Sequence, residues 1–169
     1  MAHQNILVEK ANGIGKLTIN RPPLNVIDIE TLQEMNSALE GFKRDGEVKV
    51  VVLTAAGNRA FSAGVSVQDH LGDRAPIMLE AFDRLFKILL NLDKPVIAQV
   101  NGVALGSGCE VVAGCDMVIA SDKAQFGQPE IKLGCYASVA GVLFMRLFGP
   151  KRALEFMLSG DSIDANEAE

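Results

Sequence analysis

The chain has 169 residues, of which 49% are hydrophobic and 22% are charged. This composition is typical of a globular protein and excludes a disordered chain, and the length fits a single domain over residues 1–169. Sixteen basic and 21 acidic residues give a net charge of −5, and aromatic residues make up only 5%. Neither a basic stripe nor a base-stacking surface is therefore indicated, and we expect no nucleic-acid partner.

The three cysteines, Cys109, Cys115 and Cys135, have the spacing of neither a disulfide framework nor a zinc site. We expect them to be reduced, buried and apolar in character, and with only two histidines we expect no metal site. The N-terminal segment lacks the long apolar core of a signal peptide, and no apolar run is long enough to span a bilayer. These features predict a cytoplasmic protein without membrane contact.

Apolar periodicity and turn residues predict an alternation of strands and helices. The first half of the chain is predicted to form a strand at 5–8, a hairpin turn at 12–13, a strand at 14–19, a helix at 31–42 with Asp28 as N-cap, a strand at 48–54, a turn of small residues at 57–64 and a helix at 79–92. The second half is predicted to form a strand at 95–100, a Gly-rich turn at 101–108, a helix at 110–113, a strand at 116–120 and a helix at 134–148. It ends with a helix at 150–158 that starts with Pro150 and a helix start at 165–169 with Asp164 as N-cap. The run at 48–54 is uninterrupted and rich in β-branched residues, which predicts burial on both faces. This order of elements indicates an α/β layered domain.

Two turns of small residues, 61–65 and 102–108, follow predicted strands. Small residues let the backbone approach a ligand closely, so that backbone N–H groups can point at an oxygen atom. The second turn runs into a helix start, which adds the positive end of the helix dipole. Its glycines do not have the G-x-G-x-x-G spacing, and we reject a dinucleotide site. A plain tight turn is the alternative for 61–65.

Two glutamates stand out as candidates for acid/base chemistry. Glu110 lies in an otherwise apolar segment, which predicts that it is buried and that desolvation raises its pKa, and Glu130 follows after one predicted strand. A strand and return of that length can bring the two carboxyl groups together in an apolar pocket, where their pKa values move apart. The alternatives are a structural Glu110 bonded to the backbone and a Glu130 in a surface turn.

A Ser-His-Asp triad could be written with Asp69, His70 and either Ser62 or Ser66. We disfavour it because Asp69 and His70 are adjacent in sequence and no nucleophile elbow is present.

Taken together, these segments resemble the crotonase (enoyl-CoA hydratase/isomerase) superfamily. The similar segments run in order along nearly the whole chain, at 17–22, 24–26, 51–54, 61–64, 94–98, 101–102, 106–110, 115–116 and 124–131. The resemblance implies an α/β fold of ββα units stacked in a spiral, with the C-terminal helices of the family missing after Glu169. It also implies acyl-CoA thioester substrates, no separate cofactor because coenzyme A is part of the substrate, and a homotrimer or hexamer for the full-length family.

The resemblance also implies roles for individual residues. Glu110 and Glu130 correspond to the two catalytic carboxylates, and the backbone N–H groups of Val65 and Ser107 form the oxyanion hole. The N–H of Ser138 takes the water-positioning place. The positions implied to bind substrate are Arg21, Pro23, Asn25, Ala63, Gly64 and Gly106. The family usually has Gly in place of Ser107, but a backbone donor survives that change.

The implied activity is hydration of an α,β-unsaturated acyl-CoA, because both glutamates are present. Double-bond isomerisation is an alternative within enzymes. A truncated, non-catalytic acyl-CoA-binding subunit is the alternative outside them, since the chain stops one turn into a predicted helix.

Two departures from the family pattern bear on the acyl group. Ser66 stands in place of the usual Asp, and the usual Gly-x-x-Pro-Gly-x-Gly-Gly is replaced over 134–141. The Val-x-Val-x-Asp-His run at 65–70 and the Ser-Val-Ala stretch at 138–140 resemble cyclohexa-1,5-dienecarbonyl-CoA hydratases of anaerobic aromatic degradation. That resemblance implies a cyclic dienoyl-CoA as the substrate.

Overall fold

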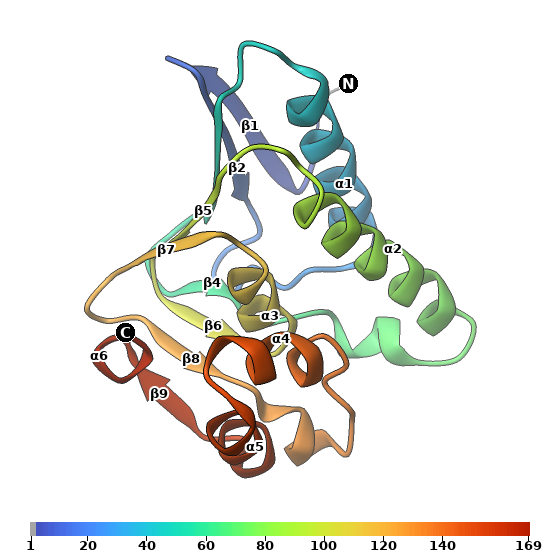
Figure 1. Cartoon of the computed structure of the whole chain (residues 1–169). Helices are drawn as coiled ribbons and strands as arrows, with labels where there is room; N and C mark the ends of the chain where they lie inside the picture. The colour runs from blue at the N-terminus through green and yellow to red at the C-terminus, as the bar shows by residue number, and fades with distance from the viewer. Residues whose placement is uncertain (1–2) are drawn as a thin grey trace.

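The computed structural model describes residues 3–169. Its elements in chain order are β1 (Ile6–Ala11), β2 (Ile14–Ile19), α1 (Ile29–Arg44), β3 (Val50–Ala55), β4 (Ala60–Ser62), the 3₁₀ helix η1 (Val67–His70), α2 (Arg74–Leu89), β5 (Val96–Val100), β6 (Val103–Leu105), α3 (Ser107–Ala113), β7 (Met117–Ala120), β8 (Gln125–Gly127), the 3₁₀ helix η2 (Pro129–Leu133), α4 (Ala140–Leu147), α5 (Pro150–Ser159), β9 (Ser162–Asp164) and α6 (Ala165–Ala168). Figure 1 shows how they are arranged, with α1 and α2 packed side by side.

The strands form two sheets, one with the order β1-β2-β3-β5-β7 and one with the order β4-β6-β8-β9. After the β1-β2 hairpin and α1, the same unit repeats: a strand in the larger sheet, a short strand in the smaller sheet, and then a helix. The successive units are β3-β4-α2, β5-β6-α3 and β7-β8-α4. Equivalent strands pair in parallel within each sheet. The predicted α/β spiral of stacked ββα units is therefore confirmed (Figure 1).

Several element bounds differ from the prediction. The short strands β4 and β6 lie in segments predicted as turns, β8 lies where no element was predicted, and α2 begins at Arg74, earlier than predicted. The predicted helix over 134–148 is wrong in its first half. Gly134 ends η2 in a left-handed conformation with a φ of +67°, and α4 begins only at Ala140. Residues 135–139 are therefore irregular, and this segment reaches the candidate site.

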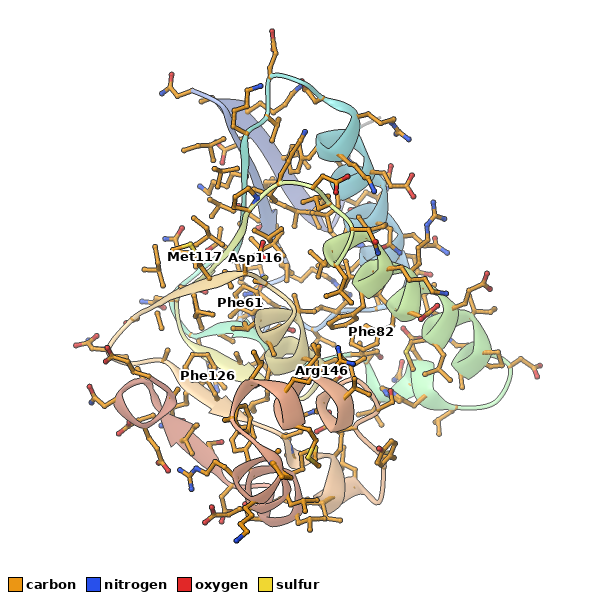
Figure 2. The ribbon with its side chains drawn as sticks, in the orientation of Figure 1. Phe61, Phe82, Asp116, Met117, Phe126 and Arg146 are labelled. Carbon is orange, nitrogen blue, oxygen red and sulfur yellow. The ribbon has the colours of Figure 1, made fainter. Side chains whose placement is uncertain are left out.

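The hydrophobic core is one cluster that joins both sheets and the helices packed on them. Phe61 of β4 lies inside it, whereas Met117 of β7 lies at the margin of the molecule and is 57% exposed (Figure 2). In β3, Val51 and Leu53 are buried on one face. On the other face Thr54 is buried but Val50 and Val52 are only half-buried, so the predicted burial of both faces is confirmed only in part. One face of β3 meets the core, and the other is less completely covered.

The cysteines differ in burial. Cys109 is buried and Cys115 is half-buried, and burial raises the pKa of each thiol to about 12. Cys135 is exposed, because it lies in the irregular segment outside the core, and the prediction of a buried side chain is wrong for it. Within residues 3–169 no helix is both long enough and apolar enough to cross a membrane.

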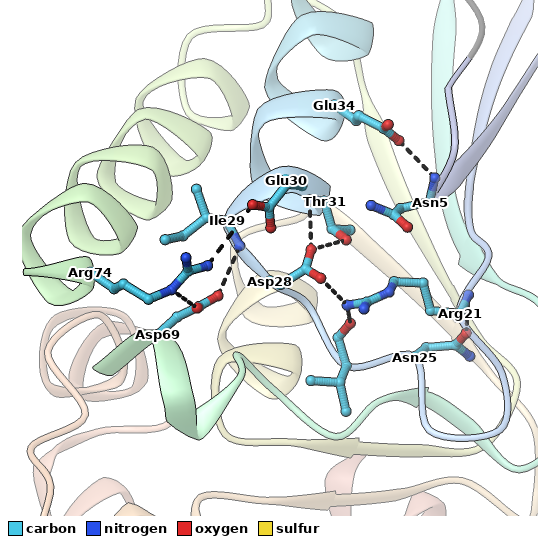
Figure 3. Close-up of polar contacts among 11 residues, drawn as sticks. Asn5, Arg21, Asn25, Asp28, Ile29, Glu30, Thr31, Glu34, Asp69 and Arg74 are labelled. Atoms are coloured by element: carbon cyan, nitrogen blue, oxygen red, sulfur yellow. Dashed lines mark hydrogen bonds and ion pairs between the residues drawn. The ribbon is translucent and has the colours of Figure 1, made fainter. Parts of the chain in front are cut away.

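The start of α1 anchors two of the loops that lead to the candidate site (Figure 3). Asp28 caps the helix as predicted, because its Oδ1 accepts a hydrogen bond from the Thr31 N–H at 2.9 Å, and its Oδ2 pairs with Nη1 of Arg21 at 2.7 Å. The buried Asp69 of η1 accepts from the Ile29 N–H at 3.0 Å and from Nε of Arg74 at 2.6 Å. The loops before α1 and around η1 are thus tied to one helix end.

Asn25 holds the first of these loops from inside. Its side chain is completely buried, and its Oδ1 accepts from the Arg21 N–H. Its Nδ2 donates to the carbonyl oxygens of Ala56 and Ala60, at 2.9 Å and 2.7 Å. The Asn25 amide therefore joins the loop to both ends of the connection between β3 and β4.

We expect Asn25→Asp to lower the free energy of unfolding by about 2–4 kcal/mol, because a buried carboxylate would face two carbonyl oxygens that it cannot bond. Urea unfolding checks this value, with Asn58→Asp as the control because it introduces the same charge at an exposed position. Equal unfolding free energies for the two variants would contradict this account of Asn25.

Candidate active site

The predicted site residues gather at one edge of the smaller sheet. Val65 follows β4, Ser107 follows β6 and Glu130 follows β8, and these three strands are parallel neighbours. The carboxyl ends of parallel strands meet at the same sheet edge, so their loops lie together. Glu110 joins them from the first turn of α3. The ββα repeat thus brings segments from three successive units to one place.

Glu110 is a buried carboxyl group with defined partners. It is 3% exposed, and its Oε1 accepts a hydrogen bond of 2.7 Å from the N–H of Ala140, the first residue of α4. Burial raises its pKa to about 7, and the charge of Glu130 adds to this effect. The backbone N–H groups of Ala140 and Val139 and the hydroxyl of Ser107 act in the opposite direction. A carboxyl group with this pKa can hold or release a proton near neutral pH.

Glu130 reaches the start of α3 from η2. It is half-buried, and burial raises the pKa of its carboxyl group, while its own backbone N–H, the Gln128 side chain and His70 lower it. Gly106 makes room for this carboxyl group, since a Cβ at Gly106 would stand 2.7 Å from Oε1 of Glu130. Gly106 also has a φ of +54°, which strains residues with a side chain. The structure therefore places both glutamates around the turn that opens α3.

The two turns of small residues are in direct contact. Gly64 has a φ of +97°, and a Cβ there would stand 3.0 Å from the Leu105 oxygen and 3.4 Å from the nitrogen of Ser107. Ser107 is the first residue of α3, where a helix leaves its N–H groups without an intrahelical partner. The Ser107 N–H thus lies next to the turn that carries Val65.

The orientation of Val65 follows from its pairing with Ile27. The two residues form a parallel bridge, in which the Ile27 N–H donates to the Gly64 oxygen at 3.0 Å and the Ser66 N–H donates to the Ile27 oxygen at 2.8 Å. In a parallel bridge, the N–H of the central residue points to the opposite side. The Val65 N–H therefore points away from Ile27.

The other predicted positions border this region. Ser138 is exposed and directly precedes Val139 and Ala140, whose N–H groups act on Glu110. The N–H of the half-buried Ala63 donates to the Leu24 oxygen at 2.9 Å, and Pro23 is exposed in the same loop.

Arg21 and Asn25 are occupied within the protein. The guanidinium group of Arg21 bonds Asp28 and the Val26 oxygen. The amide of Asn25 holds the loop, which leaves a predicted contact with substrate to its backbone.

The disfavoured Ser-His-Asp triad is not formed. Both oxygens of Asp69 are used by Ile29 and Arg74, and Nδ1 of His70 lies 2.9 Å from the backbone oxygen of Ser66. The hydroxyl of Ser62 is buried and accepts from the Gly64 N–H.

Sequence reasoning missed the backbone groups that hold Glu110. Val139 and Ala140 lay inside the helix predicted over 134–148, so neither N–H was expected to face Glu110, although the resemblance gave the N–H of the neighbouring Ser138 a role at the site. The signal that could have found them is Gly134, because a glycine followed by a new apolar run is typical of a helix end and a restart.

An apolar cavity of about 360 Å³ lies against another face of α3. Cys109, Phe126 and Phe144 line it, but its lining includes neither Glu110 nor Glu130. We therefore place the candidate chemistry at the ends of β4, β6 and β8.

Comparison with known proteins agrees with this site. The sequence profile of the enoyl-CoA hydratase/isomerase family matches residues 9–169. The chain is 38% identical to the short-chain-enoyl-CoA hydratase of Clostridium acetobutylicum and 36% identical to the crotonyl-CoA hydratase of Syntrophomonas wolfei. Each alignment covers 99% of this chain and 66% of the relative.

The fold also resembles solved structures. DspI from Pseudomonas aeruginosa and an enoyl-CoA hydratase from Bacillus anthracis match with TM-scores of 0.93 and 0.92, each at 32% identity. The matches cover 97% and 98% of this chain, and 64% and 66% of those structures. The chain belongs to the enoyl-CoA hydratase/isomerase family and spans about 66% of the length of the curated relatives named above.

We expect the Glu110 carboxyl group to titrate with a pKa of about 7, and we expect Glu130→Gln to lower that pKa, because the negative charge of Glu130 raises it. Carbon-13 NMR of glutamate labelled at the carboxyl carbon measures both values. Glu110→Gln identifies its resonance. A Glu110 resonance that titrates in the ordinary glutamate range, or that ignores the Glu130 substitution, would contradict the account of this site.

Proposed function

We propose that this site adds water to the double bond of an α,β-unsaturated acyl-CoA thioester. The observation that carries the proposal is the buried Glu110 carboxyl group, with a pKa of about 7, across the α3 turn from Glu130. The names of the two hydratase relatives support the same reaction and the same class of substrate.

The proposed mechanism starts with the thioester carbonyl oxygen, which accepts hydrogen bonds from the N–H groups of Val65 and Ser107. Negative charge develops on this oxygen as the water oxygen bonds to the β-carbon, and fixed N–H donors stabilise that charge. One glutamate accepts a proton from the water and the other donates a proton to the α-carbon, so that the elements of water are added and nothing else is consumed. Burial keeps the pKa of Glu110 near neutrality, which suits a group that must gain and lose a proton at neutral pH.

For the acyl group, we propose the cyclic dienoyl thioester cyclohexa-1,5-dienecarbonyl-CoA. The support is the resemblance of residues 65–70 and 138–140 to hydratases of that compound. Val65 belongs to the first stretch, and the N–H of Ala140, in the second, donates to Glu110. The relatives' names favour short straight-chain substrates instead. Loss of conjugated-thioester absorbance, measured with the cyclic diene and with crotonyl-CoA, decides between them. Faster hydration of crotonyl-CoA would contradict the cyclic substrate.

We expect Glu110→Gln and Glu130→Gln each to lower kcat by at least about 10², because each removes a group that transfers a proton in the reaction. Calorimetry with a saturated acyl-CoA should show that both variants still bind the thioester. Glu47→Gln is the control, since Glu47 is exposed in the turn before β3. Turnover close to that of the unmodified protein in either active-site variant would contradict the mechanism.

The oxyanion hole has its own test at Ser107. Proline is tolerated at the first position of a helix but lacks an N–H, so Ser107→Pro removes the donor with little effect on α3. We expect kcat to fall by about 10²–10³ in Ser107→Pro, and Ser107→Ala, which keeps the N–H, to stay within about tenfold of the unmodified protein. Equal losses in the two variants would assign the effect to the side chain and contradict the role of the backbone donor.

A further inference from the structure

The side chain of Gln128 is buried without a hydrogen-bond partner. It follows β8 directly and is 1% exposed, yet neither Nε2 nor Oε1 of its amide has a partner within residues 3–169. Oε2 of Glu130, two residues further on, is also buried and unpartnered. Buried polar atoms are nearly always hydrogen-bonded, so three such atoms in one short segment require an explanation.

The segment is fixed against the start of α3. The oxygen of Gly127 accepts a hydrogen bond of 2.9 Å from the N–H of Gly106. The Glu130 carboxyl group lies over the same Gly106, and hydrogen bonding from the Gln128 side chain lowers the pKa of this carboxyl group, although the separation between the two groups is too long or too poorly aligned for a well-formed hydrogen bond. The Gln128 amide and the Glu130 carboxyl group therefore lie next to each other in the interior of the candidate site.

A water molecule matches these three atoms. A buried water needs two to four polar partners, and here the amide offers both a donor and an acceptor while the carboxylate offers a second acceptor. With one O–H donating to Oε2 of Glu130 and the amide N–H donating to the water oxygen, one lone pair of that oxygen is left to react.

We infer that Gln128 is a positioning residue that, together with Oε2 of Glu130, holds the water molecule that is added to the substrate. This inference rests on the proposed function. As the water oxygen bonds to the β-carbon, its proton passes to a carboxylate of the glutamate pair, and the other glutamate protonates the α-carbon. Gln128 exchanges no proton and orients the water throughout.

Gln128→Met tests the inference, because it keeps a similar volume and removes both polar atoms. We expect kcat to fall by about 10–10², since a misplaced nucleophile is costly, while KM stays within about twofold. The pH limb that Glu130 controls should move to higher pH, because the amide lowers the pKa of that carboxyl group. The other titratable groups that act on or respond to Glu130 are His70 of η1 and Glu110 and Cys109 of α3, and all three are unchanged in the variant.

Gln125→Met is the matched control, since Gln125 is exposed at the start of β8. It should have the kcat, KM and pH profile of the unmodified protein. Gln128→Met with an unchanged kcat and pH profile would overturn the inference and leave the proposed function intact. An unmodified protein that hydrates neither the cyclic diene nor crotonyl-CoA would instead overturn the proposed function, and this inference with it.

A high-resolution crystal structure of the unmodified protein provides a readout that does not depend on the stability of the variant. We expect an ordered water within hydrogen-bond distance of the Gln128 amide and Oε2 of Glu130. The absence of an ordered water within hydrogen-bond distance of both side chains would overturn the inference.

Discussion

Burial of the Glu110 carboxyl group between α3 and the start of α4 is the constraint on which the rest of the site depends. A carboxyl group that is 3% exposed is unfavourable in its charged form unless hydrogen-bond donors face it. The N–H of Ala140, at 2.7 Å, is such a donor, and it stands at the helix end that favours negative charge. The bond links the start of α4 to α3. Desolvation and the nearby charge of Glu130 outweigh these donors, and the pKa of Glu110 stays near neutrality.

The second requirement is close approach at two glycines. Glu130 and Gly106 come from different ββα units, as do Gly64 and Leu105. A Cβ on the glycine would stand 2.7 Å from Oε1 of Glu130 in the first case and 3.0 Å from the Leu105 oxygen in the second. These contacts place two N–H groups and two carboxyl groups around one turn. The hydrogen bonds of Asp28, Asp69 and Asn25 hold the surrounding loops to α1 and to the β3–β4 connection. A site of this kind gains its precision from rigid supports some distance from the chemistry.

Local signals predicted the parts of the fold that depend on nearby residues. Asp28 and Asp164 cap helices and Pro150 lies at a helix start, because these roles need only a few neighbouring residues. The strands β4, β6 and β8 were not predicted. Each has three residues and is formed by pairing with segments distant in the sequence, so it carries no periodicity of its own. The whole smaller sheet, which positions the site, therefore depends on contacts that a local pattern does not contain.

The site, like the fold, was predictable from the sequence only where neighbouring residues determine the structure. The apolar surroundings of Glu110 in the sequence correctly predicted its burial and a raised pKa. The roles of Val65 and Ser107 came from resemblance to a family and stay predictions. The apolar spacing over 134–148 predicted a continuous helix, and it failed because Gly134 adopts a left-handed conformation and the chain restarts at Ala140. The buried, unpartnered amide of Gln128 has no sequence signature, because its meaning comes only from the atoms that surround it.

The most direct test of the central claim is product analysis by mass spectrometry after the protein acts on an unsaturated acyl-CoA in D₂O. The account predicts a hydroxyacyl-CoA with deuterium at the α-carbon, because one glutamate delivers a solvent-derived proton there while water bonds to the β-carbon. Deuterium in the acyl chain without a gained hydroxyl group would show isomerisation and contradict hydration. Binding of the thioester with no change in its mass would contradict an enzymatic role for the glutamate pair.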